Sequence, residues 1–188
     1  PDGPFIKYQD NPILRPTTKF EADKVYNPSV IVEDGRFSML YRAEGINTGT
    51  GVICLAYSED GLNFQRYQNN PVLVAEHEYE REGVEDRRMV KFGQKYYLTY
   101  VGAGDQTPGN ICLAISSDLI SWEKKGEILQ PKSNAWNSRQ LKAGAIVPDS
   151  VNGKYLMFFQ GEKEPWKTRI GIAYSHDLVH WYEPIDTP

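Results

Sequence analysis

The residues best suited to chemistry are four consecutive charged side chains, Glu85, Asp86, Arg87 and Arg88. A carboxyl group beside arginines can donate a proton to a leaving oxygen, form a structural ion pair, or belong to a solvated run of charge. The residue types alone are compatible with all three roles. Their position in the fold must therefore decide between them.

The chain contains three copies of one unit, which repeat about every 59 residues. The first half of the unit occurs as GRFSMLYRAEG (35–45), QKYYLTYVGAG (94–104) and GKYLMFFQGEK (153–163). The second half occurs as YSEDGLNF (57–64), ISSDLISW (115–122) and YSHDLVHW (174–181). Equivalent residues such as Phe37, Tyr96 and Tyr155 are 59 positions apart. Chance similarity would not keep this register over so many positions.

Each copy predicts four antiparallel strands and no sustained helix. Tight hairpins are predicted at EDGR, FGQK and VNGK, where Gly or Asn can adopt positive φ. The first three strands of each unit are predicted at 27–33, 36–43 and 51–57, at 86–92, 95–102 and 110–116, and at 144–149, 154–161 and 168–174. Four-stranded units of this length stack radially, so we predict an all-β fold, a β-propeller of four-stranded antiparallel blades.

The repeats predict a single, partial propeller domain over residues 1–188, with blades at about 24–75, 83–132 and 141–188. Because closed propellers have about 4 to 8 blades, we expect either further blades in a larger parent protein or closure by a self-associating copy, and we favour the parent. The segment 1–16 contains NPIL, which resembles NPVL in the first repeat. We expect it to be the closing outer strand of the last blade.

The first strand of each propeller blade lines the central channel, so the residues entering these strands should converge at one mouth. Asn27, Asp86 and Ala145 occupy the three entries at intervals of 59 residues. Alternation along the strand then points Asp86 and Arg88 into the channel, with Glu85 and Arg87 toward neighbouring blades. This position favours a chemical role for Asp86 over a solvated charge run. The ends of the second strands, with Arg42, Glu44 and Glu162, are expected nearby.

The motifs YNPSV, YRAEG, GVEDRR, YYLTYVG, LKAGAIVP and GKYLMFF occur in this order along nearly the whole chain. In this order they resemble glycoside hydrolase family 130, whose members are five-bladed propellers that act on β-mannosides, many by phosphorolysis. The chain would correspond to the first three of five blades. Gly83, Glu85, Asp86 and Arg88 match the family's G-x-E-D-P-R motif, with Arg87 in place of the proline. The resemblance implies that Asp86 is the catalytic acid and that Asn27, Arg42 and Lys142 contact sugar or phosphate.

The nucleophile is open between water and inorganic phosphate. The resemblance implies a His-Arg pair in phosphorylases at positions that hold Phe159 and Gln160 here, and Gln160 cannot supply the charge that phosphate needs. Glu162 could instead activate water in an inverting hydrolase, which needs two carboxyl groups about 6.5–9.5 Å apart. We therefore favour hydrolysis, with Asp86 and Glu162 as catalytic residues, although Arg139 and Lys142 keep phosphate binding open. The predicted substrate-binding residues are Asn27, Arg42, Glu44, Glu85, Arg88, Arg139, Lys142 and Trp136.

Two aromatic residues and two cysteines complete the candidates. Trp136 and Trp166 occur in polar segments, where each can be an exposed sugar platform or can pack under a loop. Cys54 and Cys112 occupy equivalent strands of neighbouring repeats, too far apart for a disulfide, and we expect buried thiols. Neither cysteine has a Cys or His partner at metal-ligand spacing. We expect neither a metal nor an organic cofactor, with inorganic phosphate as the one candidate co-substrate.

The composition restricts the partners. A net charge of -4 with scattered Lys and Arg argues against nucleic acids and anionic membranes, and no apolar run is long enough to span a bilayer. We expect a soluble protein, either cytoplasmic or secreted after removal of a signal, and an oligosaccharide substrate. Two other functions stay open: a non-catalytic carbohydrate-binding propeller, and a scaffold for protein association. Charged residues at the channel entries argue against the scaffold.

Overall fold

The computed structural model describes residues 6–46, 50–105 and 107–184, and its strands form three four-stranded antiparallel sheets. The strands and the two short 3₁₀ segments are, in chain order, η1 (Lys19–Glu21), β1 (Lys24–Glu33), β2 (Arg36–Glu44), β3 (Val52–Ser58), β4 (Gln65–Arg66), η2 (Glu78–Glu80), β5 (Gly83–Phe92), β6 (Lys95–Gly104), β7 (Thr107–Ser116), β8 (Glu123–Leu129), β9 (Gln140–Val151), β10 (Lys154–Glu162), β11 (Thr168–Ser175) and β12 (Trp181–Tyr182). The predicted all-β fold with four-stranded blades is confirmed.

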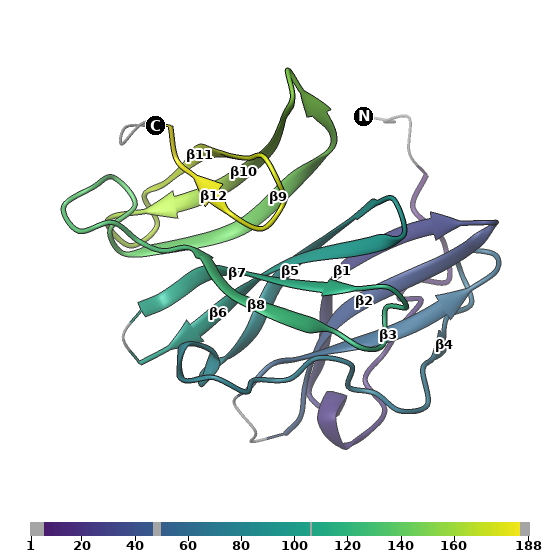
Figure 1. Cartoon of the computed structure of the whole chain (residues 1–188). Coiled ribbons are helices and arrows are strands. Elements are labelled where there is room, and N and C mark those ends of the chain that lie inside the picture. The colour runs from purple at the N-terminus through teal and green to yellow at the C-terminus, as the bar shows by residue number, and fades with distance from the viewer. Residues whose placement is uncertain (1–5, 47–49, 106, 185–188) are drawn as a thin grey trace.

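Each sheet is a simple meander in which sequential strands pair, and the sheets are β1–β4, β5–β8 and β9–β12. We call them blades 1, 2 and 3; they follow one another across the molecule in Figure 1. The first strand of blade 2, β5, contacts both β1 and β9. The first strands of the three blades are therefore neighbours, as expected for strands that line the centre of a propeller.

The hairpins follow the turn chemistry of the sequence. Asp34 and Gly35 both have positive φ between β1 and β2, and Asn152 and Gly153 do so between β9 and β10. Such turns match the twist of the strands that they join. A second turn, S-x-D, repeats after the third strand of each blade. In blade 2, Oδ1 of Asp118 accepts the backbone N–H groups of Ile120 and Ser121, and this carboxylate satisfies donors that would otherwise be unpaired.

Apolar side chains hold the blades together. Leu40, Leu55 and Leu98 belong to one buried cluster that joins blades 1 and 2, while Leu141 and Met157 belong to a second that includes residues of blades 2 and 3. Burial of each such side chain contributes about 1.5–3 kcal/mol. Cys54 and Cys112 lie fully buried as free thiols, as predicted.

A short segment precedes each first strand and fixes where that strand begins. The backbone N–H of Asp23 donates to the carbonyl of Glu44, 3.0 Å away, and Glu82 donates likewise to Ala103 over 2.8 Å. In blade 3 the pair is Arg139 and Glu162, at 2.9 Å. The start of each first strand is thus anchored to the end of the second strand of the same blade.

Residues 6–18 contain no strand, and Leu14 packs against the buried cluster of blade 1. The assignment of 1–16 to the last blade stays a prediction, and residues 1–5 of that segment and 185–188 of the third predicted blade lie outside the described residues. None of the helices in the described part of the chain is long and apolar enough to cross a membrane.

Candidate active site

A β-bulge interrupts the first strand of each blade close to its start, where the sequence predicted the channel entry. Two residues of the first strand oppose one residue of the second: Asn27 and Pro28 oppose Tyr41, Asp86 and Arg87 oppose Tyr100, and Ala143 and Gly144 oppose Phe159. The first bulge residue has a left-handed φ in every blade, 50° at Asn27, 41° at Asp86 and 52° at Ala143. Left-handed non-glycine residues are unusual and cluster at functional sites, where they aim a side chain.

The bulge corrects one sequence prediction. Asn27, Asp86 and Ala145 were expected to be equivalent because they are 59 residues apart, but the residue of blade 3 at the bulge is Ala143. The reason lies farther along β9, where residues 147–149 oppose the single residue Leu156 and add two residues to the strand. Equivalent residues of blades 2 and 3 are therefore 57 positions apart before the insertion, as Asp86 and Ala143 are, and 59 positions apart after it. The β9–β10 hairpin projects beyond its neighbours in Figure 1.

Asn27 and Asp86 meet across the interface between blades 1 and 2. The amide Nδ2 of Asn27 donates to Oδ1 of Asp86 over 2.8 Å, and both side chains are partly buried. Among the hydrogen bonds of the described residues, none involves Oδ2, the other carboxylate oxygen of Asp86. Ala143 of blade 3 has no polar group, so the chemistry at the three bulges is concentrated in blades 1 and 2.

Arg87, the second bulge residue of blade 2, is wholly buried. Its Nη2 donates to the backbone carbonyl oxygens of Asn27 and of Tyr26, the latter at 3.1 Å. Burial lowers the pKa of Arg87 to about 9, and the positive charge of Arg42 adds to this decrease. Arg88 is exposed, and its Nη1 donates to the carbonyl of Arg87 over 2.9 Å.

A network of charges links all three blades beside this pair. Nη2 of Arg42 contacts Glu44 at 2.7 Å and Glu85 of blade 2 at 2.8 Å, while Lys142 of blade 3 lies 3.7 Å from Glu85. Burial alone would raise the pKa of Glu44, but hydrogen bonds from Tyr26 and Lys24 outweigh it and lower that pKa. The structure therefore brings four predicted substrate-binding residues together next to Asp86.

Glu162, the predicted base, is held on both oxygens. Oε1 accepts from Nη1 of Arg139 at 2.6 Å and from the backbone N–H of Trp166 at 3.3 Å, and Oε2 accepts from Gln140 at 2.7 Å. The residue is 4% exposed. A carboxylate whose oxygens are occupied by an arginine and an amide is poorly placed to accept a proton from water. Arg139 is correspondingly committed to Glu162, although its side chain is 38% exposed.

Of the two alternatives that the sequence left open for Trp136, the structure shows packing in the interior and not an exposed sugar platform. Trp136 is 8% exposed and stacks on Phe159, with ring centroids 5.8 Å apart. A side chain at Gly161 or Gly171 would collide with its indole, so both glycines make room for it. With the insertion taken into account, Trp136 is equivalent to Phe20 and Tyr79, and these also pack against buried clusters. Trp166, by contrast, is 94% exposed.

Sequence reasoning missed a repeated buried cluster behind the candidate site. In blade 1, Glu21 accepts from Tyr41 over 3.0 Å and pairs with Arg66. In blade 2, Glu80 accepts from Tyr100 over 2.6 Å and pairs with Lys124 over 2.7 Å. Both glutamates are fully buried. The signal was available, because Glu21 and Glu80 are 59 residues apart, as are the two tyrosines that oppose the bulges.

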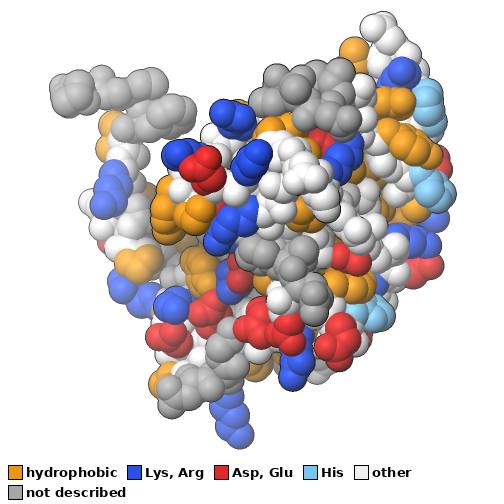
Figure 2. Space-filling model, turned by 90° about the vertical axis from the view of Figure 1, so that its left-hand side faces the viewer, with side chains coloured by type: hydrophobic (Ala, Val, Ile, Leu, Met, Phe, Trp, Pro, Cys, Tyr) orange, Lys and Arg blue, Asp and Glu red, His pale blue; other side chains and the backbone are white. Residues whose placement is uncertain are grey.

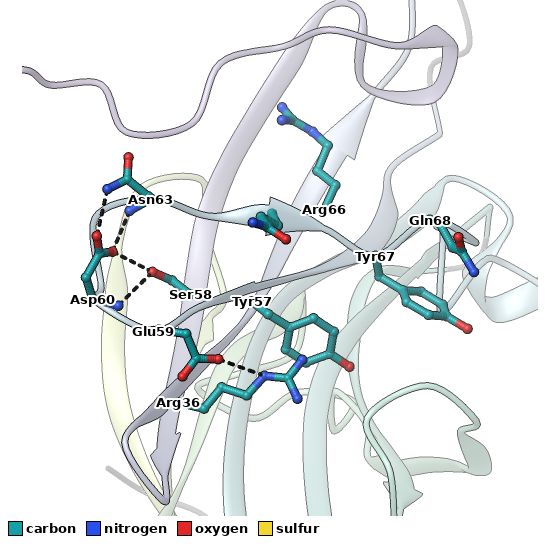
Figure 3. Close-up of a pocket in the computed structure, with 10 residues that line it drawn as sticks. Arg36, Tyr57, Ser58, Glu59, Asp60, Asn63, Arg66, Tyr67 and Gln68 are labelled. Carbon is teal, nitrogen blue, oxygen red and sulfur yellow. Dashed lines mark hydrogen bonds and ion pairs between the residues drawn. The ribbon is translucent and has the colours of Figure 1, made fainter.

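The surface around the entry carries charges of both signs. Figure 2 views the side of the molecule that lies at the left in Figure 1, and acidic and basic side chains lie intermixed on it. A separate hollow beside β3 and β4 is lined by Arg36, Tyr57, Glu59 and other residues of blade 1 (Figure 3). Cζ of Arg36 lies 3.8 Å from the centre of the Tyr57 ring in this hollow. None of the predicted site residues lines the hollow. Among the described residues, no group of three or more His, Cys, Asp and Glu could hold a metal ion.

The fold agrees with that of known proteins. The family model described as beta-1,4-mannooligosaccharide phosphorylase matches residues 4–187. The chain belongs to glycoside hydrolase family 130. The bulge at Asp86 lies within GVEDRR, one of the motifs on which the resemblance to this family was based.

Family 130 relatives include two curated proteins of Thermoanaerobacter sp. (strain X514). A 1,2-beta-oligomannan phosphorylase is 36% identical over 187 residues, which cover 94% of this chain and 58% of the relative. A beta-1,2-mannobiose phosphorylase is 36% identical over 178 residues, 86% of this chain and 56% of the relative. The chain therefore spans somewhat more than half the length of these relatives.

A solved structure is similar over 96% of this chain and 58% of its own, with 26% identity and a TM-score of 0.79. The description of this structure states that the GH130 family of mannoside phosphorylases contains glycoside hydrolases that target beta-1,2 mannosidic linkages in Candida mannan.

Proposed function

We propose that the protein cleaves β-1,2-linked mannosides with inversion, with Asp86 as the general acid. The observation that carries this proposal is the bond from Asn27 to Oδ1 of Asp86, a carboxyl group aimed by a left-handed bulge at the channel entry. Because Asn27 occupies Oδ1 as a donor, the proton of the acid belongs on Oδ2. That proton passes to the glycosidic oxygen as the bond to the sugar carbon breaks, and Asp86 then regains a proton from solvent.

We propose inorganic phosphate as the nucleophile. Hydrolysis was favoured from the sequence, with Glu162 as base, but the bonds from Arg139 and Gln140 to both oxygens of Glu162 weaken that support. A phosphate oxygen would bond to the anomeric carbon from the opposite face of the ring, giving an α-mannose 1-phosphate and a shortened oligosaccharide. The names of the two curated relatives support phosphorolysis and the β-1,2 linkage.

Hydrolysis is the second candidate, and one specific feature favours it. Phe159 and Gln160 occupy the positions where the family resemblance implies the His-Arg pair of phosphorylases, so phosphate would lack that contact. Cationic groups elsewhere would have to replace it. Lys142, partly exposed, and the exposed Arg88 are the candidates.

The other residues at the entry are proposed to bind and orient the sugar. Arg42, Glu44 and Glu85 form a preorganised network of ion pairs. The remaining hydrogen-bond donors and acceptors of these side chains can bind the hydroxyl groups of the sugar. Arg139 holds Glu162 in place at the rim. In this scheme Glu162 supports the site and does not transfer a proton.

The test uses the native full-length protein with β-1,2-mannobiose, with and without phosphate. We expect turnover that depends on phosphate and releases mannose 1-phosphate and mannose in equal amounts. Phosphate-independent release of two mannose molecules would favour hydrolysis instead. Asp86→Asn is expected to abolish most turnover under either condition, and full activity of this variant would refute the assignment of the acid.

A further inference from the structure

Arg87 is an unexpected residue at its position. It lies wholly buried between blades 1 and 2, and two of its nitrogens, Nε and Nη1, have no hydrogen-bond partner. Burying a guanidinium with unpaired nitrogens is costly. The bulge itself does not need it, because the equivalent residue of blade 1 is Pro28 and the family resemblance implies proline here as well. The contacts that Arg87 does make must therefore explain its presence.

Those side-chain contacts go to Asn27, the hydrogen-bond partner of Asp86, and to Tyr26 directly before it. Nη2 of Arg87 donates to the backbone carbonyl oxygens of Tyr26 and Asn27. The side chain of the same Asn27 donates to Asp86, the residue directly before Arg87. Two consecutive residues of blade 2 thus hold Asn27 of blade 1. Arg87 donates to the backbone carbonyl of Asn27, and Asp86 accepts a hydrogen bond from the side chain of Asn27.

Asn27 needs such support. Its φ of 50° lies in the left-handed region, and residues other than glycine stay there only when their surroundings fix them. The following residue is Pro28, which lacks an N–H and cannot anchor the bend by donating a backbone hydrogen bond. A buried, charged donor on the adjacent carbonyls supplies this anchor, because charge-assisted hydrogen bonds are the stronger ones.

We infer that Arg87 is a positioning residue for the acid: it fixes the left-handed bend at Asn27, so that the Asn27 amide holds Asp86 in its productive orientation. Since Arg87 is wholly buried, it does not touch substrate itself. The inference rests on the proposed function, because it assigns Arg87 a role in the orientation of the acid.

The test compares two substrates in the native full-length protein. The leaving group of β-1,2-mannobiose is a sugar hydroxyl that needs the proton of Asp86 as the glycosidic bond breaks, whereas 2,4-dinitrophenyl β-mannoside has a leaving group that departs without one. For Arg87→Met we expect kcat on mannobiose to fall about 10- to 100-fold and kcat on the dinitrophenyl substrate to change less than about threefold. Arg87→Lys, which keeps a charged donor, is expected to recover most of the loss. Arg36→Met, at the separate hollow of blade 1, is the control and is expected to leave both rates unchanged.

A double-mutant cycle then tests whether Arg87 acts through Asn27. If it does, Asn27→Ala combined with Arg87→Met is no slower on mannobiose than Asn27→Ala alone. Losses that multiply in the double variant, or equal losses of Arg87→Met on both substrates, would overturn the inference. Should Arg87→Met not fold, Arg87→Gln is measured with the same criteria.

Asp86→Asn in the same assays separates this inference from the proposed function. If Asp86→Asn slows both substrates equally, the assignment of the acid fails. If Asp86→Asn discriminates between the substrates and Arg87→Met does not, only the role of Arg87 fails.

Discussion

Blades 1 and 2 differ from blade 3 in what they bury against the second strand. In blades 1 and 2 a glutamate from the preceding segment accepts a hydrogen bond from a tyrosine and pairs with a basic residue. In blade 3 the tyrosine is replaced by Phe159, and Trp136 stacks on it. The same backbone unit is therefore closed in two ways. In blades 1 and 2 a buried glutamate pairs with a tyrosine and a basic residue, and in blade 3 two aromatic rings stack beside the buried Asn137, which donates to Glu183.

The same division appears at the channel entry. All three blades keep the left-handed bulge, but the first bulge residue is Asn27 in blade 1, Asp86 in blade 2 and Ala143 in blade 3. The repeated backbone provides the direction of a side chain, and the sequence of each copy decides whether that side chain has a chemical group. The candidate acid thus belongs to one interface, between blades 1 and 2, rather than to the repeat as a whole.

The largest effect on stability is expected at the stacked aromatic pair of blade 3. Trp136→Ala should lower the free energy of unfolding by about 3–5 kcal/mol, because a large buried side chain is lost and Gly161 and Gly171 cannot fill the space. Urea unfolding measures the loss. Trp166→Ala is the matched control, since this indole is 94% exposed, and it should change stability by less than about 0.5 kcal/mol. A neutral Trp136→Ala would show that the indole is not part of the core.

A smaller loss is expected where blade 2 is polar. Glu80→Gln should cost about 1.5–3 kcal/mol, because the bonds from Lys124 and Tyr100 lose their charged acceptor. Burial raises the pKa of Glu80, but the bonds from Lys124 and Tyr100 outweigh it and lower that pKa. The contribution of Glu80 is therefore complete above the pKa of the unfolded chain, about 4.3, and is lost as the pH falls through the lower value of the folded state.

Urea titrations of wild type and Glu80→Gln between neutral and acidic pH measure this dependence. The exposed Glu82→Gln is the control and should resemble wild type throughout. A difference between wild type and Glu80→Gln that grows as the pH falls would have the wrong sign for this account.

The smallest effect is expected where the blades do not differ, at the S-x-D turns. Burial raises the pKa of Asp118, but the backbone N–H groups of Ser121 and Ile120 lower it more. Asp118→Asn should cost at most about 1 kcal/mol, because solvent screens this exposed carboxylate. The cost should be present above about pH 4 and should shrink below it. Unfolding of the equivalent Asp60 and Asp177 variants should show the same pH dependence, and a different sign in one blade would mean that the turns are not equivalent.

The sequence predicted most of the fold because the repeat can be recognised by comparing one part of the chain with another. Three copies with aromatic alternation and Gly or Asn at the hairpins specify the strands and their order. The phase of the repeat also predicted that Asn27 and Asp86 occupy equivalent strand entries. The insertion at 147–149 could not be seen in this way, because the spacing of 59 returns after it and conceals the shift to 57 before it.

The remaining differences arise from contacts between blades, which spacing within one repeat does not describe. Arg87 reaches the backbone of Tyr26 and Asn27, about 60 residues earlier in the chain. Glu162 and Arg139 both carry charges suited to a site, but they pair with each other. Whether a charged residue is free or paired depends on distances that a single sequence does not contain.

The most direct test of the central claim is the leaving-group dependence of Asp86→Asn in the native full-length protein. If Asp86 donates the proton, kcat on β-1,2-mannobiose should fall about 10²- to 10⁴-fold, while kcat on 2,4-dinitrophenyl β-mannoside should fall far less. Unchanged turnover of mannobiose, or equal losses on the two substrates, would contradict the account.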